Sequence, residues 1–351
     1  MHRTIGFMQF LGVLLLLAAS GRVAAFDLQF SISDPSGLFS AEQVELLQVA
    51  LGRAERMWET AIVGYQSGIN IPAVPISVYP TTAGLAAANF TGQSFQGGYW
   101  LSTGGFININ VHEILNFSNW QGPGANGRNY LDELLAHETG HVLGIGTLWD
   151  DNGVYVNNSF HYVGQFGVAA YLAEFNDNTT WAPVENAGNP GTPNSHWDQL
   201  MRSSPQEGNP MDPYSLDPRV GVVDAYGRDR GLELMTGAID PDYGEPFLSR
   251  FTVESMRDLG YRVARFEDCN GNGAVNVLDL NILLANMGAT DLAIDSVAFG
   301  DVNRDRRVDA ADLALWRQAA PEPPSIALVV LAAASLAGRR VARPWRGRAR
   351  R

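Results

Sequence analysis

The chain of 351 residues contains no lysine, and all 24 of its basic side chains are arginines. The 37 acidic residues outnumber them, which gives a formal net charge of −13. Because a protein that binds nucleic acid needs basic side chains to neutralise phosphates, this charge argues against a nucleic-acid partner. Cysteine is almost absent as well, and the single Cys269 excludes an internal disulfide.

The apolar content of 46% is sufficient for a large core, so a wholly disordered chain is excluded. The length fits one large domain plus a small one, or two medium ones. Residues 1–25 have a basic start, an apolar run and small residues at Val23 and Ala25. This pattern predicts a secretory signal peptide.

Residues 319–351 lead from a Pro-Glu-Pro triplet through a short apolar run to seven arginines. The run is shorter than the roughly 20 residues that span a bilayer. This tail resembles the PEP-CTERM sorting signal, which implies recognition by an exosortase-like sorting protease. It also implies export to the cell envelope or the outside of a Gram-negative-type bacterium. A plain membrane anchor is the alternative.

Residues 26–264 combine helical and strand patterns and are predicted to form one α+β domain. Residues 40–62 carry apolar side chains at helical spacing behind Ser40, a predicted helix N-cap. The segments "AVPISVYP" (73–80) and "GGFININVHEI" (104–114) alternate as strands do. Long stretches rich in Gly, Pro, Asn and Asp come later and are predicted to be surface loops that can also build a substrate cleft.

The segment "LLAHETGHVLGIGTLW" (134–149) places His137 and His141 four residues apart, with Glu138 beside the first histidine. On an α-helix, two such histidines project from one face and can hold the same metal ion. Glu138 is then positioned to accept a proton from a zinc-activated water. Gly144 is predicted to end this helix in a left-handed conformation. These features predict one catalytic Zn²⁺.

A protease-type zinc site requires a third protein ligand. In the short-spaced metzincin pattern this ligand is a histidine six residues after the second one, but that position is Thr147 here. Three other histidines and one carboxylate are the candidates: His112, His161, His196 and Glu174.

The surroundings of His196 resemble those of the leishmanolysin-like metzincins, in particular their secreted bacterial relatives. The likeness is carried by "HETGHVLGIGTLW", "VENAGNPGTPNSHWDQ", "LELMTG" and "FLSRFTVESMRDLGY", and it covers residues 40–262. It implies a twisted sheet with an active-site helix and an irregular C-terminal subdomain. It also implies three zinc ligands and a general base, which are His137, His141 and His196 with Glu138.

The same likeness implies a methionine turn beneath the metal, at Met235. The spacing between His196 and this methionine is longer than in the family, so residues 200–230 are interpreted as an insertion. Met211 is the alternative turn methionine. An insertion so close to the cleft leaves the substrate open.

Residues 266–318 contain two copies of a 12-residue pattern, each followed by a short apolar helix. Oxygen-bearing side chains occupy the positions at which an EF-hand loop binds Ca²⁺. They are Asp268, Asn270, Asn272, Asn276 and Asp279 in the first copy, and Asp301, Asn303, Asp305, Asp309 and Asp312 in the second. The pair resembles a type I dockerin. This resemblance implies a small all-α domain, up to two structural Ca²⁺ ions and a cohesin-like binding partner.

The second copy departs from the EF-hand pattern at position six, where a sharp turn favours glycine. Gly273 occupies this position in the first copy and Arg306 in the second. A left-handed arginine costs about 1 kcal/mol, so the second loop is expected to be strained. An acidic linker and a calcium-stiffened spacer are the alternatives to a cohesin-binding dockerin. In dockerins the cohesin contacts positions 10 and 11, which are here Val277, Leu278, Ala310 and Ala311.

Together, these patterns predict an exported zinc-dependent endopeptidase that acts on protein or peptide substrates and carries a calcium-binding module. A non-proteolytic surface adhesion or scaffold protein is the alternative, although such a protein has no need for a general base at Glu138. A zinc hydrolase acting on bonds other than peptide bonds is a third interpretation.

Overall fold

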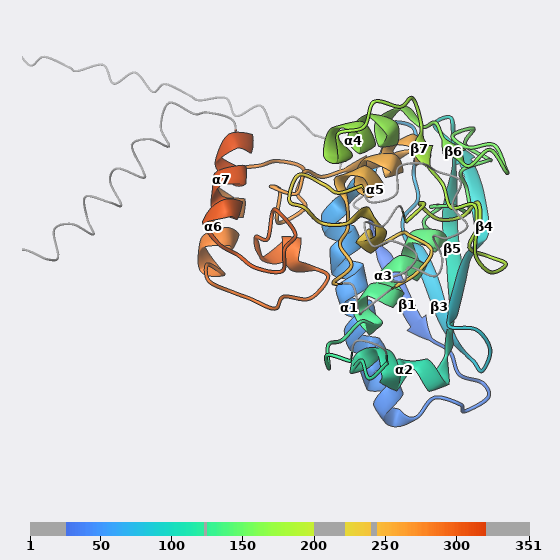
Figure 1. Ribbon diagram of the computed structural model, residues 1–351. Helices are drawn as coiled ribbons and strands as arrows, with labels where there is room; N and C mark the ends of the chain where they lie inside the picture. The colour runs from blue at the N-terminus through green and yellow to red at the C-terminus, as the bar shows by residue number, and fades with distance from the viewer. Residues whose placement is uncertain (1–25, 123–124, 200–221, 240–243, 321–351) are drawn as a thin grey trace, which may run out of the picture.

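The computed structural model describes residues 26–122, 125–199, 222–239 and 244–320 (Figure 1). The predicted signal peptide, Met211, the arginine-rich tail and most of the predicted insertion lie outside these residues. The described chain is a mixed α+β body followed by a small helical module, so the predicted fold class is confirmed at this level. No helix in these four ranges is long and apolar enough to cross a membrane.

A four-stranded sheet with the order β1-β3-β5-β4 forms one wall of the body. Its strands are β1 (Leu28–Ile32), β3 (Val74–Thr81), β4 (Ala86–Gln96) and β5 (Tyr99–Asn110). β1, β3 and β5 run parallel, whereas β4 pairs antiparallel with β5. The strand predicted at 73–80 is confirmed.

The strand predicted at 104–114 is too long, because its last residues belong to a helix. Asn110 ends β5 and accepts a hydrogen bond from the backbone N–H of His112. This N-cap starts α2 (Val111–Ser118), a helix that alternation alone did not reveal.

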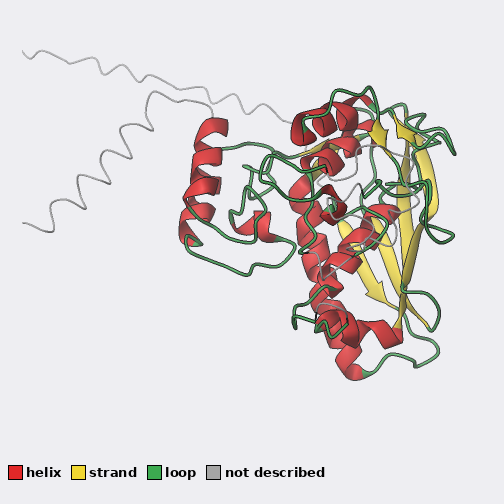
Figure 2. Cartoon of the chain, in the orientation of Figure 1, coloured by secondary structure: helices red, strands yellow, loops and turns green. Residues whose placement is uncertain are grey.

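Two long helices cover one face of the sheet (Figure 2). They are α1 (Ala41–Ala61), which Ser40 caps as predicted, and α3 (Leu131–Val142), which carries the histidine motif. The Trp58 indole N–H of α1 donates to the Ala136 carbonyl of α3 at 2.9 Å. On the sheet side, a Cβ on Gly105 would lie 2.4 Å from a Val142 methyl. Glycine therefore allows α3 to lie directly against β5.

The rest of the body is irregular, as the stretches rich in Gly, Pro, Asn and Asp predicted. Its short elements are β2 (Ile62–Tyr65), β6 (His161–Tyr162), α4 (Gln165–Phe175), β7 (Ala182–Pro183), η2 (Arg230–Leu232), α5 (Arg250–Ser255), η3 (Met256–Leu259) and β8 (Tyr261–Val263). β8 pairs antiparallel with β2 and brings the end of the body back to the end of α1. The module therefore starts beside α1.

The module consists of α6 (Val277–Ala285), η4 (Ser296–Phe299) and α7 (Ala310–Ala319). In Figure 1 it lies on the side of α1 that faces away from the sheet. Its buried apolar residues are few: Phe266, Cys269, Leu283, Ile294, Val297, Val302, Val308 and Trp316. An ion pair between Arg56 of α1 and Asp295 joins the module to the body.

Candidate metal centre

His137 and His141 lie one turn apart on the same face of α3. Every residue of this helix is buried, including the polar ones. The two imidazoles are therefore held inside the body, where burial of an unpaired polar group is costly.

The turn after α3 brings a distant loop to these histidines. Gly144 adopts a φ of +116°, as predicted for a glycine that ends the helix. Gly146 has a φ of +73°, and a Cβ on it would lie 2.1 Å from the Ser195 carbonyl oxygen. Only glycine allows the chain to approach so closely, and the residue after Ser195 is His196.

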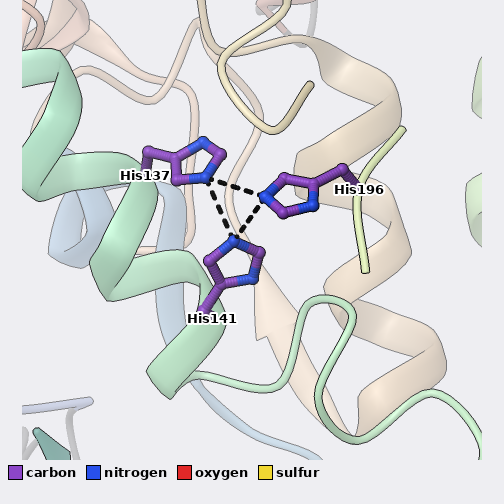
Figure 3. A group of neighbouring side chains, drawn as sticks. All are labelled: His137, His141 and His196. Atoms are coloured by element: carbon purple, nitrogen blue, oxygen red, sulfur yellow. Dashed lines mark hydrogen bonds between the residues drawn. The ribbon is translucent and has the colours of Figure 1, made fainter. Parts of the chain in front are cut away.

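The three histidines point their Nε2 atoms at one another (Figure 3). These atoms are 3.0 Å apart between His141 and His137, 3.0 Å between His141 and His196, and 3.2 Å between His137 and His196. A tetrahedral zinc ion with bonds of about 2.0–2.1 Å needs nitrogens about 3.3 Å apart. The triangle therefore has nearly the size that a zinc ion requires.

A backbone carbonyl holds the other nitrogen of each ring. The Nδ1 atoms of His137, His141 and His196 lie 2.6, 2.9 and 2.9 Å from the carbonyl oxygens of Leu234, Ile145 and Thr192, respectively. Because a carbonyl oxygen only accepts, each Nδ1 must carry the proton, and each Nε2 then presents a lone pair. Three lone pairs that face one another cannot satisfy each other, but they can bind one cation.

The electrostatics of the site favour neutral rings. Burial and, to a smaller extent, the neighbouring His141 together lower the pKa of His137 to about 3. Burial lowers the pKa of His141 too, and it places the pKa of His196 well below the usual value, with His141 and His137 adding to the shift. Neutral imidazole is the form that binds metal ions.

Glu138 is also buried, beside the first histidine. Its Oε2 atom has no hydrogen-bond partner among the described residues. Burial raises the pKa of this carboxyl to about 8. A buried carboxyl group with an unpaired oxygen and a raised pKa is a candidate functional group.

Met235 lies beneath the helix that carries the first two histidines. A Cβ on Gly140 would lie 2.6 Å from the Met235 sulfur, so glycine makes room for this side chain against α3. The Leu234 carbonyl accepts from the His137 ring, and the Met235 carbonyl accepts from the Trp197 backbone N–H at 3.0 Å. The "ELMTG" segment thus contacts both the helix and the His196 loop.

The other candidates for the third ligand lie elsewhere. His112 and His161 are exposed, and the His161 ring stacks on Trp181 at 3.7 Å. Glu174 accepts from backbone N–H groups of α5. The Thr147 hydroxyl donates to the His141 carbonyl at 2.6 Å, so it stabilises the helix end. Within the described residues, His137, His141 and His196 are the only group of three or more His, Cys, Asp or Glu side chains with ligand atoms within 4.8 Å.

The two predicted calcium loops have the same internal hydrogen bonds. In the first, the Asp268 carboxylate accepts from Asn272 and Gly273 N–H, and Asp279 accepts from Asn270 and Asn276 N–H. In the second, the equivalent acceptors are Asp301 and Asp312, and the donors are the N–H groups of Asp305, Arg306, Asn303 and Asp309. The sequence duplication is therefore a structural duplication.

In both loops, the carboxylates at positions 1 and 12 are close enough for their negative charges to repel each other. Burial raises the pKa of Asp312 to about 6, and the charges of Asp301 and Asp305 add to the rise. Burial raises the pKa of Asp268 as well, with Asp279 adding to the shift. A cation that interacts with these oxygens would offset both effects.

Comparison with known proteins bears on the module. Residues 266–319 match the type I dockerin domain. A dockerin domain indicates a calcium-binding module of the kind that interacts with cohesins, and the predicted dockerin domain is confirmed. No curated protein matches the chain.

The sequence motifs singled out Arg306 as an arginine in a glycine position, but they did not predict that Arg304 and Arg306 connect the module to the body. Their side chains leave the second loop and end at Glu174 and Glu133. One feature of the sequence could have indicated their role. The matching positions of the first loop are glycines, Gly271 and Gly273, so an arginine at these positions is unusual.

Proposed function

We propose that the chain is an exported zinc-dependent endopeptidase of the metzincin type, carried together with a calcium-binding dockerin module. The observation that supports it most is the convergence of three Nε2 lone pairs in the core, each fixed by a carbonyl at Nδ1. Beside them lies a buried carboxyl, Glu138, with an unpaired oxygen.

His137, His141 and His196 fit a zinc ion by donor type, protonation state and spacing, and three protein ligands leave a fourth position for water or substrate. When bound, zinc supplies the Lewis acidity that makes water a nucleophile at neutral pH and polarises the peptide carbonyl. Glu138 would act as general base in its ionised form, which the charge of a bound cation favours over the protonated form that burial alone favours. The carboxylate would take the proton of the attacking water and then deliver it to the leaving amine. The carbonyls of Leu234, Ile145 and Thr192 orient the three rings.

The family likeness adds support for the metzincin type. Met235 lies against Gly140 on the histidine helix, as a methionine turn beneath the metal requires. The spacing between His196 and Met235 remains longer than in the family, so the peptide sequence that the cleft prefers is not part of the proposal.

In the module, we propose one Ca²⁺ per loop, held by the side chains predicted from the sequence. The first set is Asp268, Asn270, Asn272, Asn276 and Asp279, and the second is Asp301, Asn303, Asp305, Asp309 and Asp312. Asn276 and Asp309 also cap α6 and α7, so each loop and its helix form one unit. The proposed export and sorting rest on the predicted signal peptide and the PEP-CTERM-like tail.

A non-proteolytic surface scaffold is the second candidate, and one observation favours it. Several apolar side chains of α6 are exposed on the module: Val277, Leu278 and Leu284. A cohesin-like partner would cover part of this face, and binding alone would then be the function.

One experiment separates the two candidates. The mature chain is analysed for zinc and incubated with casein, with and without a zinc chelator. An endopeptidase has about one zinc per chain and cleaves casein only when the metal is present. Bound zinc without any cleavage would favour the scaffold, and a chain without zinc would contradict both the metal site and its chemistry.

A further inference from the structure

The two predicted calcium loops share a backbone conformation, and the differences between them that matter here are at positions 4 and 6. Positions 4 and 6 are left-handed in both loops: Gly271 and Gly273 have φ of +63° and +88°. Arg304 and Arg306 have φ of +63° and +66° at the same positions of the second loop. A side chain at such φ values strains the backbone, so an arginine there needs a compensating contact.

Arg306 makes this contact with the helix that carries the histidine motif. Its guanidinium donates to the Glu133 carboxylate at 2.9 Å and to the Pro246 carbonyl at 2.9 Å. Both charged side chains are buried, at 7% and 6% exposure. Burial raises the pKa of Glu133 to about 7 against the opposing effect of the Arg306 charge. Glu133 is one helical turn before His137 on α3.

Arg304 makes a similar buried contact with α4 and with the segment just before α5. It donates to the Glu174 carboxylate at 3.1 Å and to the Leu248 carbonyl at 2.7 Å. Glu174 in turn accepts from the N–H groups of Arg250 and Phe251 at the start of α5. This ion pair is also buried, with both side chains 8% exposed.

α5 contacts the residue that follows the third histidine. The Thr252 hydroxyl of α5 accepts from the Trp197 indole N–H at 2.9 Å, and Trp197 follows His196 in the chain. From the body side, the Arg228 guanidinium donates to the carbonyl oxygens of Asn303 and Arg304 in the loop itself. The second loop is thus joined to both elements that support the candidate metal centre.

The first loop also approaches the body, but without such side chains. A Cβ on Gly271 would lie 3.1 Å from the Glu59 carbonyl oxygen at the end of α1. Glycine there permits a close approach of two backbones and leaves no long side chain to enter the body. The first loop therefore shows that the loop backbone forms with glycine at positions 4 and 6. The arginines of the second loop are not required for this backbone, and they add contacts with the body.

We infer that the second loop is an intramolecular docking site, in which Arg304 and Arg306 bind the body of the same chain and the proposed calcium ion fixes the loop backbone from which they extend. The Asp301 carboxylate, a proposed calcium ligand, already accepts the Arg306 N–H at 2.8 Å, so cation and arginine act on the same backbone segment. Calcium in this loop therefore stabilises α3 and α5. The inference rests on the calcium part of the proposed function and is independent of proteolysis.

The test uses the mature chain with Glu138→Ala, which prevents self-digestion, and compares amide hydrogen exchange in a calcium-selective chelator and in calcium. In the parent chain, calcium slows exchange several-fold in residues 131–142 and 250–255 as well as in the module. The double variant Arg304→Gly/Arg306→Gly gives positions 4 and 6 of the second loop the glycines of the first and leaves every proposed ligand in place. Calcium then slows exchange in the module only. The control is Arg307→Gly, which removes an exposed arginine of the same loop.

Calcium titration of the same three proteins makes the outcomes distinguishable. Two bound ions in both the parent and the double variant, with loss of the effect on α3 and α5 in the double variant alone, support docking. Equal slowing in the double variant would overturn it, and so would a parent chain in which calcium binds but leaves residues 131–142 and 250–255 unchanged. If the parent chain binds no calcium at the second loop, both this inference and the calcium proposal fail, while the zinc proposal stands.

Discussion

The candidate metal centre of the body and the loops of the module obtain their ligands in different ways. In the body, His137 and His196 are 59 positions apart and meet because buried elements pack together. In the module, each set of oxygen ligands comes from one 12-residue segment. The first site depends on the tertiary fold, and the second depends on local sequence.

This difference predicts opposite responses to metal removal. The histidines are held in place by three carbonyls and by a wholly buried helix, so we expect the body to keep the shape of its site when the ion is removed. The module has few buried apolar residues, and a core of that size rarely holds some fifty residues unaided. Its order should depend on the ion.

The largest expected effect is the loss of zinc on removal of one ring. His196→Ala should strip zinc as completely as His141→Ala, because two remaining imidazoles do not close the site. Metal content after gel filtration measures this. The controls His112→Ala and His161→Ala remove exposed histidines and should retain about one zinc. If His196→Ala kept its zinc and its activity, the third ligand would have to be sought elsewhere.

The next effect separates chemistry from binding. Glu138→Ala should lower casein hydrolysis by roughly 10²–10⁴-fold, the usual contribution of a general base, and leave zinc near one per chain. Glu138→Gln is the conservative companion, because it keeps the size of the side chain but cannot take a proton. Parallel assays of rate and metal content test this. Retained cleavage in both variants would remove Glu138 from the mechanism.

A smaller effect concerns the order of the module. In a Glu138→Ala chain, a calcium-selective chelator should make residues 266–319 sensitive to added trypsin, which finds only arginines to cleave after in this lysine-free chain. Carboxylates such as Asp301 and Asp312 repel one another until a cation offsets their charge. Calcium should restore resistance, and magnesium should do so weakly because it demands a tighter geometry. Equal resistance in chelator would mean that the module is folded without calcium.

Local patterns explain why much of the chain could be predicted. The Ser40 cap, the strand at 73–80, the helix with His137 and the two loops are each specified by neighbouring residues. The prediction failed at Asn110, where a single N-cap side chain converts an alternating segment into α2. The position of His196 was favoured only by the family likeness, because no spacing rule relates it to α3.

The docking of the second loop lay beyond any local pattern. Arg306 and Glu133 are 173 positions apart, and the sequence around either residue does not predict its contact with the other. Arg306 in a glycine position predicted strain, and the φ of +66° agrees with a left-handed residue there. Its compensation comes from a buried carboxylate in another domain, which only the assembled fold reveals.

The smallest expected effect tests how the fold assembles the metal centre. Gly146→Ala and Gly153→Ala both place a side chain at a left-handed position, with φ of +73° and +67°, and each should cost about 1 kcal/mol in the free energy of unfolding. At Gly146 the new Cβ also clashes with the backbone of Ser195, which must then move together with the neighbouring His196. At Gly153 the corresponding Cβ has no described atom within 4 Å apart from its chain neighbours. Overpacking of this kind typically costs a further ~1–3 kcal/mol.

Urea unfolding of the two variants measures the difference in stability, and competition with a chromogenic chelator measures their zinc affinity. Gly153→Ala should bind zinc as tightly as the parent chain, because its Cβ would contact no residue beyond its chain neighbours. Gly146→Ala should bind more weakly, because displacement of His196 opens the triangle of Nε2 atoms. Equal zinc affinities would show that the His196 loop adjusts without moving its ring, and the close approach at Gly146 would then serve stability alone.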